Sequence, residues 1–251
     1  MRLVDYKIIA NQKLTEQVCS MRLFAPFDGN PPHAGQFVNV QINGLYLRRP
    51  ISICDYDREN GILTLVYKII GQGTTQMAAM RTGENLNIMQ WLGNGYSLVR
   101  AKKPILVGGG VGVPPLFYLA KQLLAIGQVP TVILGFRTAD EVILYDDFRR
   151  LAVSQTIVTT EDGSYGARGF VTDALKTFGG YDAVYSCGPE PMLKAIYAQT
   201  QDVADHAAQF SFERRMGCGF GACMGCSCET IAGYKRICKE GPVLTKEDIV
   251  W

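Results

Sequence analysis

Short stretches of alternating apolar and polar residues dominate the first hundred positions of the chain. Runs rich in β-branched and aromatic residues recur there between turn signals, which is typical of antiparallel strands. The runs lie at residues 6–10, 18–24, 36–42 and 62–70, and the turn signals lie at 28–32, 43–44 and 59–61. Several short strands joined by turns predict a closed antiparallel β-barrel.

The hydrophobic pattern changes after residue 101. Continuous apolar runs, typical of buried strands, alternate there with segments of helical periodicity. The predicted strands begin at residues 104, 129, 156 and 181, and the first predicted helix covers 116–125. This alternation predicts a doubly wound parallel α/β sheet with helices on both faces. We therefore divide the chain into a barrel domain at 1–98, an α/β domain at 99–209 and a small C-terminal module at 210–251.

Composition narrows the class of protein. The chain has 251 residues, of which 47% are hydrophobic and 19% charged, as expected for two globular domains and a small extra module. A net charge of +2 gives no indication of the strongly basic surface that nucleic-acid binding requires. The sequence shows neither a signal peptide nor an apolar run of about 20 residues that would span a membrane. We expect a cytoplasmic protein whose cysteines serve metal or redox chemistry.

Cysteines are concentrated in the C-terminal module, where five of the eight lie between residues 218 and 238. Cys218, Cys223 and Cys226 follow the pattern C-x4-C-x2-C, and Cys238 precedes Gly241-Pro242. This is the thiolate spacing of a plant-type [2Fe–2S] site. The intervening glycines permit the close backbone approach that such a loop needs. We predict these four cysteines as ligands and Cys228 as a neighbour.

Two other uses of the cysteines stay open. Structural zinc also takes four cysteines, but it usually shows two C-x2-C pairs, and only Cys223 and Cys226 form one here. A disulfide framework requires an oxidising compartment, for which the sequence carries no signal.

A candidate phosphate site lies in the barrel. Arg48 and Arg49 precede Pro50 at a predicted strand end, and arginine suits bidentate phosphate contact, although a solvated sheet edge explains such a pair equally well. The turn Gly71-Gln-Gly73-Thr74 opens a predicted helix, whose N–H groups and dipole attract anions. Together these features predict a pyrophosphate site.

The motifs Arg-Pro-Ile-Ser, Val-Tyr-Lys and Gly-x-Gly-Thr resemble the FAD-binding domain of the ferredoxin–NADP reductase superfamily. The resemblance implies that the arginine contacts the FAD pyrophosphate, that the serine lies by the isoalloxazine, that the tyrosine strand faces the ribityl chain and that the Gly-Thr helix start caps the phosphates. The implied FAD-binding residues are Arg49, Pro50, Ile51, Ser52, Val66, Tyr67, Lys68, Gly73 and Thr74.

Two loops of the α/β domain resemble the pyridine-nucleotide domain of the same superfamily. One is the glycine run that follows the strand at Pro104, which by itself is also compatible with a tight strand–helix turn, and the other is Cys-Gly-Pro-x-Pro-Met. The implied NAD-binding residues are Gly108, Gly109, Gly110, Gly112, Cys187, Gly188 and Pro189. Cys187 is alternatively a small buried hydrophobe. Arg137 follows a strand and is either solvated or a contact for a 2′-phosphate.

The order of FAD domain, NAD domain and C-terminal cysteine module resembles the electron-transfer subunits of type B dihydroorotate dehydrogenases. The match includes Ile-Cys-Lys-Glu-Gly-Pro-Val-Leu at 237–244, while the short spacing from Cys226 to Cys238 and the extra Cys228 depart from the family pattern. The resemblance implies a heterotetramer with an FMN-containing catalytic subunit, from which electrons pass through the [2Fe–2S] cluster and FAD to NAD+ in pyrimidine biosynthesis.

Alternative functions stay open from the sequence. The same module serves sulfite reductase or sulfide dehydrogenase/transhydrogenase complexes, a self-contained reductase would feed a soluble acceptor, and a zinc-stabilised nucleotide-binding regulator would not be an enzyme. The sequence shows no recognisable set of catalytic side chains. The only histidines are His33 and His206, and both are expected at the surface. We therefore predict that cofactors carry the chemistry. The apolar side chains of the module either pack on the flavin domain or face a partner.

Overall fold

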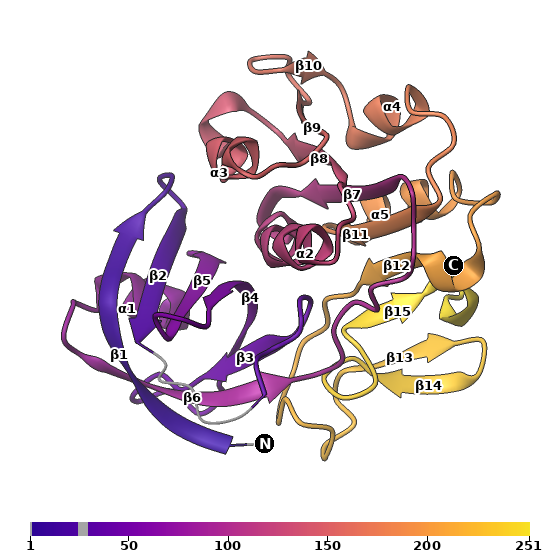
Figure 1. Cartoon of the computed structure of the whole chain (residues 1–251). Helices are drawn as coiled ribbons and strands as arrows, with labels where there is room; N and C mark the ends of the chain where they lie inside the picture. Colours follow the sequence, from indigo (N-terminus) through magenta and orange to yellow (C-terminus); the bar gives the residue numbers. More distant parts are fainter. Residues whose placement is uncertain (1, 25–29) are drawn as a thin grey trace.

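The computed structural model describes residues 2–24 and 30–251, which form a barrel, a layered α/β unit and a C-terminal module (Figure 1). Part of the turn predicted at 28–32 lies outside the described residues.

The N-terminal part is the closed antiparallel barrel that the alternating pattern predicts, with the strand order β1-β2-β5-β4-β3-β6. Its elements are β1 (Arg2–Lys13), β2 (Val18–Phe24), β3 (Phe37–Val40), β4 (Arg49–Asp57), β5 (Ile62–Lys68), α1 (Gln72–Ala79) and β6 (Asn85–Leu92). Alternate strand residues such as Met21, Leu23 and Leu65 are fully buried and fill the interior.

Two details of the barrel differ from expectation. Arg49 is the first residue of β4, where it pairs with Val40 of β3, so it stands at the start of a strand and not at the end of a preceding one. Helix α1 begins at Gln72 instead of near Gln76, because the Thr74 hydroxyl accepts the backbone N–H groups of Ile70 at 2.9 Å and Gly71 at 3.2 Å and stabilises an earlier start.

The α/β part is built on a seven-stranded sheet in the order β10-β9-β8-β7-β11-β12-β15. Its strands are β7 (Pro104–Gly109), β8 (Thr131–Phe136), β9 (Gln155–Thr160), β10 (Ala167–Arg168), β11 (Ala183–Cys187), β12 (Ala208–Ser211) and β15 (Val243–Thr245). Neighbouring strands are parallel, apart from β15, which runs antiparallel to β12 at the edge. The predicted parallel sheet is therefore confirmed, with one antiparallel strand added.

Helices cover both faces of this sheet. They are α2 (Pro114–Ala125), α3 (Tyr145–Arg150), α4 (Val171–Lys176) and α5 (Glu190–Tyr197), and the short 3-10 turns are η1 (Gly110–Gly112), η2 (Ala139–Glu141), η3 (Asp205–Ala207) and η4 (Lys246–Asp248). On one face, Phe117 of α2 and Phe148 of α3 stack edge to face with ring centroids 5.3 Å apart. Helices α4 and α5 contact each other on the opposite face. Helix α2 starts before the predicted Leu116, because proline fits the first helical turn.

The C-terminal module is anchored to the sheet at both ends. Strand β12 crosses the predicted boundary between residues 209 and 210, and β15 returns the chain to the edge of the same sheet. Between them lies the hairpin of β13 (Ser227–Thr230) and β14 (Gly233–Arg236). The buried Lys246 donates hydrogen bonds to the carbonyls of Thr200 at 3.0 Å and Val203 at 2.9 Å. The three-part division of the chain stays a prediction.

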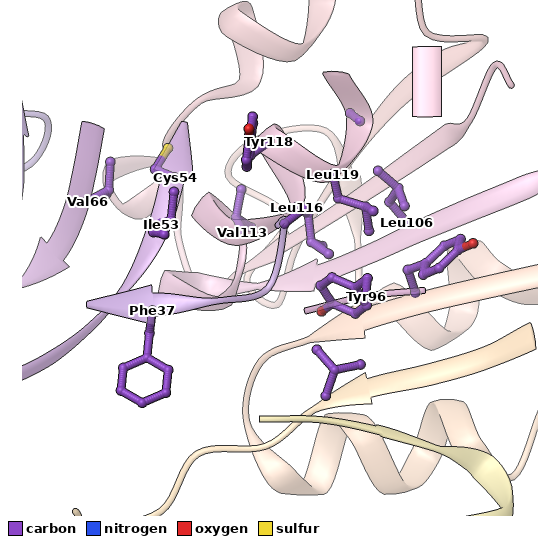
Figure 2. Close-up of a cluster of buried hydrophobic side chains, with 14 of the residues drawn as sticks. Phe37, Ile53, Cys54, Val66, Tyr96, Leu106, Val113, Leu116, Tyr118 and Leu119 are labelled. Atoms are coloured by element: carbon purple, nitrogen blue, oxygen red, sulfur yellow. The ribbon is translucent and has the colours of Figure 1, made fainter. Parts of the chain in front are cut away.

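Helix α2 joins the barrel to the sheet. It packs against β4 of the barrel and against β7 and β11, and Figure 2 shows Val113 and Leu116 of this region between Ile53 and Leu106. Across the same boundary the Tyr118 hydroxyl donates to the Pro32 carbonyl at 3.3 Å, and the Tyr96 hydroxyl donates to the Ser186 carbonyl at 3.0 Å. These contacts consequently hold the predicted flavin site and the predicted nucleotide site in a fixed orientation relative to each other.

Candidate functional site

The predicted flavin residues come together at one end of the barrel. Arg49 at the start of β4 lies over the first turn of α1, so closely that a methyl group on Gly73 would stand 2.3 Å from the Arg49 Nε atom. A larger residue at 73 would force the Arg49 guanidinium to move away from the helix start. A guanidinium beside a helix N-terminus combines two kinds of anion donor. The arrangement therefore fits a phosphate-bearing cofactor such as FAD.

The other predicted FAD residues lie on the same three elements. Pro50, Ile51 and Ser52 continue β4, Val66, Tyr67 and Lys68 end β5, and Thr74 follows Gly73 in α1. The Tyr67 hydroxyl donates to Asn11 Oδ1 at 3.0 Å, and burial raises the pKa of this tyrosine. Their roles toward FAD stay predictions.

The two predicted nucleotide loops lie side by side. Strands β7 and β11 are parallel neighbours, and their register pairs Gly108 with Cys187. The glycine run therefore leaves the sheet beside the Cys187-Gly188-Pro189 turn, at the carboxyl ends of the strands where such sheets bind ligands. The turn η1, which contains Gly110 and Gly112, also contacts β5 of the barrel. The predicted nucleotide and flavin residues thus face a common boundary.

Cys187 is held as a neutral thiol. Burial raises its pKa to about 12, against a smaller opposing effect of a hydrogen bond with Ser211. A protonated thiol is a poor nucleophile at neutral pH. This residue therefore suits packing against a ligand better than covalent chemistry.

The cysteine loop, residues 217–226, presents its sulfurs to its own backbone. The N–H groups of Ala222 and Cys223 point at Cys218 Sγ at 3.2 and 3.5 Å, and the Cys218 N–H points at Cys223 Sγ at 3.4 Å. Elsewhere in the module the Cys238 N–H donates to Cys226 Sγ at 3.3 Å. The four predicted ligands thus form two pairs, Cys218 with Cys223 and Cys226 with Cys238.

The electrostatics of the two pairs differ. Burial by itself would raise the pKa of Cys218, but backbone N–H groups of Phe220, Cys223 and Ala222 stabilise its thiolate and lower the pKa to about 6. Burial, followed by the neighbouring Cys226, raises the pKa of Cys238 to about 12. A cation at this place would stabilise all of these thiolates.

The donor set fits a two-iron cluster. Within residues 2–24 and 30–251, no three His, Cys, Asp or Glu side chains converge as a group that could hold a metal ion. Two separate pairs are nevertheless what a [2Fe–2S] cluster needs, because each of its irons takes two protein ligands. The ligand assignment stays a prediction.

Cys228 lies on β13 and lines a separate cavity of about 130 Å³ together with Phe212, Arg214 and Trp251. Burial raises the pKa of its thiol. This thiol contributes to the wall of the cavity, and its place as a neighbour of the ligands stays a prediction.

Arg236 holds the cysteine loop from one side. Its Nη1 atom donates to the Gly221 carbonyl at 2.6 Å, and its Nε atom donates to Glu240 at 3.0 Å. Sequence reasoning missed this ion pair, because it joins the end of β14 to the following turn and not two positions on one helix face.

The basic residue after β8 has a partner that the sequence analysis also missed. Arg137 donates to Glu141 Oε1 through Nε at 2.9 Å, and this bond lowers the pKa of Glu141. Glu141 ends η2 in the following turn. Arg137 is therefore ion-paired on the surface and not merely solvated.

The apolar residues of the module divide into two groups. Phe210 and Phe212 are buried, whereas Phe220 and Met224 on the cysteine loop are 41% and 53% exposed. Packing explains the first pair, and the second pair stays available to a partner. His33 and His206 are exposed. None of the helices in the described residues is long and apolar enough to cross a membrane.

Two family models match the chain. Residues 213–250 match the iron–sulfur cluster binding domain of dihydroorotate dehydrogenase B, and residues 106–198 match the oxidoreductase NAD-binding domain. Both matches fall on segments for which the sequence analysis predicts the same ligands.

Relatives match over the whole length. A Fusobacterium nucleatum protein named dihydroorotate dehydrogenase B (NAD(+)), electron transfer subunit, is 39% identical, and the match covers 99% of each chain. A protein of the same name from Caldanaerobacter subterraneus is 37% identical over 98% of this chain and 97% of its own.

Solved structures share the architecture. A structure reported for flavin-based electron bifurcation by an NADH-dependent reduced ferredoxin–NADP oxidoreductase superposes with a TM-score of 0.88 at 28% identity, covering 98% of this chain and 90% of its own. Phthalate dioxygenase reductase superposes with a TM-score of 0.70 at 21% identity, covering 84% of this chain and 70% of its own. The second likeness concerns the fold alone.

Proposed function

Because this chain belongs to the family of dihydroorotate dehydrogenase B electron transfer subunits, we propose that it carries electrons from a dihydroorotate-oxidising catalytic subunit to NAD+. The observation that carries this function is the full-length match to relatives of that name, at 39% identity over 99% of both chains. The chain is an oxidoreductase subunit that acts with a catalytic partner.

The overall reaction balances without a further reactant. Dihydroorotate loses two electrons and two protons and becomes orotate, while NAD+ takes up both electrons and one proton, so that one proton is released. FAD supplies the conversion between the paired electrons of nicotinamide and the single electrons of an iron–sulfur cluster. The protein contributes binding and orientation.

This chain's residues have separate tasks in the proposal. Arg49 and the start of α1 hold the FAD phosphates, supported by the close approach of Arg49 to Gly73. The glycine run after β7 and the Cys187 turn hold NAD, supported by their adjacent register. Cys218, Cys223, Cys226 and Cys238 hold the [2Fe–2S] cluster, supported by the two thiol pairs.

We infer an FMN-containing catalytic subunit, two copies of each subunit in a heterotetramer, no membrane span and a place in cytoplasmic pyrimidine biosynthesis. Exposed Phe220 and Met224 on the cysteine loop suit a protein contact. The cytoplasm suits thiolate ligands, because thiols stay reduced there.

A second candidate keeps the electron-transfer function and changes the partner. It is favoured by the match to the electron-bifurcation structure, which covers 98% of this chain at a TM-score of 0.88. A partner of the sulfite reductase or sulfide dehydrogenase type would use the same three sites.

Purification of the tagged chain from its own host under anaerobic conditions tests both candidates. We expect a flavin-containing partner to co-purify and the complex to reduce NAD+ in the presence of dihydroorotate. A complex whose flavin and cluster are reduced by NADH, but which does not oxidise dihydroorotate, would support the second candidate and contradict the first.

A further inference from the structure

A side-chain amide from the barrel reaches the cysteine loop. Asn39 lies in β3, far from the module in sequence, yet its Nδ2 atom donates a hydrogen bond to the Cys218 carbonyl oxygen at 3.3 Å. The residue is only 1% exposed. A polar side chain is costly in such a place unless its hydrogen bonds are made.

The loop approaches Asn39 as closely as its backbone allows. Gly219 has a φ of +77°, and a methyl group added to it would stand 2.2 Å from Asn39 Nδ2. Any larger residue at 219 would collide with the amide and would also be strained in this conformation. The Cys218-Gly219 segment is therefore shaped around the Asn39 side chain.

A chain of hydrogen bonds holds the Asn39 backbone in place. Arg48 donates to the Asn39 carbonyl at 3.1 Å and to Asn87 Oδ1 at 2.7 Å. Asn87 in turn donates to Asp5 at 2.7 Å. These bonds connect three further barrel segments to Asn39, so that the amide is presented from a rigid support.

The orientation of the amide follows from its surroundings. Asn39 Oδ1 is buried and has no hydrogen-bond partner in the protein. Rotating the amide by half a turn would bring this oxygen against the Cys218 carbonyl oxygen and would leave the N–H groups unused. The buried amide of Asn39 therefore acts as a hydrogen-bond donor to the Cys218 carbonyl oxygen.

We propose that Asn39 is a positioning residue for the iron–sulfur cluster: its amide fixes the carbonyl of the ligand Cys218 and thereby holds the cysteine loop against the barrel that carries the flavin site. The inference rests on the proposed function, since it requires a cluster on Cys218. Groups that orient metal ligands typically change metal affinity by about 10- to 100-fold when they are removed. Cluster retention is therefore the property that Asn39 controls.

The test uses the complete chain with its cofactors, purified anaerobically. The rate of iron release from the dithionite-reduced protein to a ferrous chelator is measured for Asn39→Leu, which keeps the branched shape of the side chain and removes the donor. We expect release about 10- to 100-fold faster than in the wild type, with an altered electron paramagnetic resonance line shape. Flavin content should not change, because Asn39 is not among the predicted flavin residues.

Gln128→Leu is the matched control. Gln128 also donates an amide hydrogen bond to a backbone carbonyl, that of Val99 at 3.0 Å, at a partly buried place away from the cysteines. Its iron release should equal that of the wild type. Equal acceleration in both variants would indicate general loosening of the fold and would overturn the proposal.

A second pair of variants approaches the contact from the loop. Gly219→Ala should accelerate iron release in the wild-type background more than in an Asn39→Ala background, because the shorter side chain removes the collision. The positioning role would be overturned, with the proposed function left intact, by either of two results. One is an equal effect of Gly219→Ala on iron release in both backgrounds, and the other is a rate of iron release from Asn39→Leu equal to that of the wild type. A wild-type chain that binds no cluster would overturn the proposed function together with this inference.

Discussion

Lys121 and Asp55 form an ion pair between the two large parts of the molecule, with the Lys121 Nζ atom 2.7 Å from an Asp55 carboxylate oxygen. Lys121 belongs to α2 and Asp55 to barrel strand β4. Because the ion pair is partly exposed, it contributes less to stability than the apolar packing of α2 on β4. The main consequence of this ion pair is that it helps to fix the position of the barrel relative to the sheet.

The four predicted cluster ligands are distinguished from Cys228 by substitution. Cys238→Ser removes one member of the Cys226–Cys238 pair, and we expect the cluster to be lost. Cys228→Ser changes a thiol in the wall of a separate cavity, and we expect the cluster to persist. Iron content and visible absorbance of both proteins decide the matter. Cluster loss in the Cys228 variant, with retention in the Cys238 variant, would overturn the ligand assignment.

Arg49→Ala should weaken FAD retention. Loss of a charged hydrogen-bond donor to a phosphate is expected to lower affinity on the order of 10- to 100-fold. Flavin per polypeptide after gel filtration measures the effect. Arg22→Ala is the control, because Arg22 is an exposed arginine on barrel strand β2. Full flavin content in the Arg49 variant would exclude the pyrophosphate role.

Cys187 should resist alkylation near neutral pH. With its pKa raised to about 12 by burial, only about one thiol in 10,000 is ionised at pH 8. The thiolate is the reactive form, so modification should accelerate about tenfold for each pH unit well beyond pH 9. Peptide mapping after iodoacetamide treatment follows this residue. Labelling that levels off near pH 9 would show that the thiol is not held neutral.

Glu141→Gln should weaken the discrimination against NADPH. The residue after the second strand of such sheets lies near the adenosine ribose, and Arg137 occupies this place after β8. In the wild type the Arg137 guanidinium is ion-paired with the Glu141 carboxylate. Replacing this carboxylate by a neutral amide leaves Arg137 free to bind a 2′-phosphate. We expect the ratio of kcat/KM for NADPH to that for NADH to rise about tenfold, the effect of one charged hydrogen bond.

A matched change elsewhere controls for that experiment. Asp147→Asn removes the partner of Arg150, an exposed ion pair in the same domain, and should leave the ratio unchanged. An unchanged ratio in the Glu141 variant would mean that Arg137 does not face the ribose.

The local patterns in the sequence were sufficient for the barrel, the parallel sheet and the cysteine spacing. Alternation and apolar runs are properties of neighbouring residues, and β2 begins and ends at the predicted residues. The edge strand β15 was not predicted, because its three residues acquire strand geometry only by pairing with β12. Such pairing depends on tertiary context and leaves little local signal.

The candidate site was predicted to a similar depth. The motifs singled out Arg49, the two nucleotide loops and the four cysteines, because each chemistry requires fixed spacing, and the roles of these residues stay predictions. The Asn39 contact with Cys218 joins residues 179 positions apart and has no local signature. The pairing of Glu141 with Arg137 was not predicted, because it depends on the short turn η2 that follows β8.

An anaerobic titration of the complete chain with NADH tests the central claim most directly. The claim is that this one chain connects NADH to a one-electron iron–sulfur centre through a flavin. We predict that NADH alone bleaches the flavin absorbance and produces the electron paramagnetic resonance signal of a reduced [2Fe–2S] cluster. A colourless protein that contains zinc and shows no NADH-dependent signal would contradict the account.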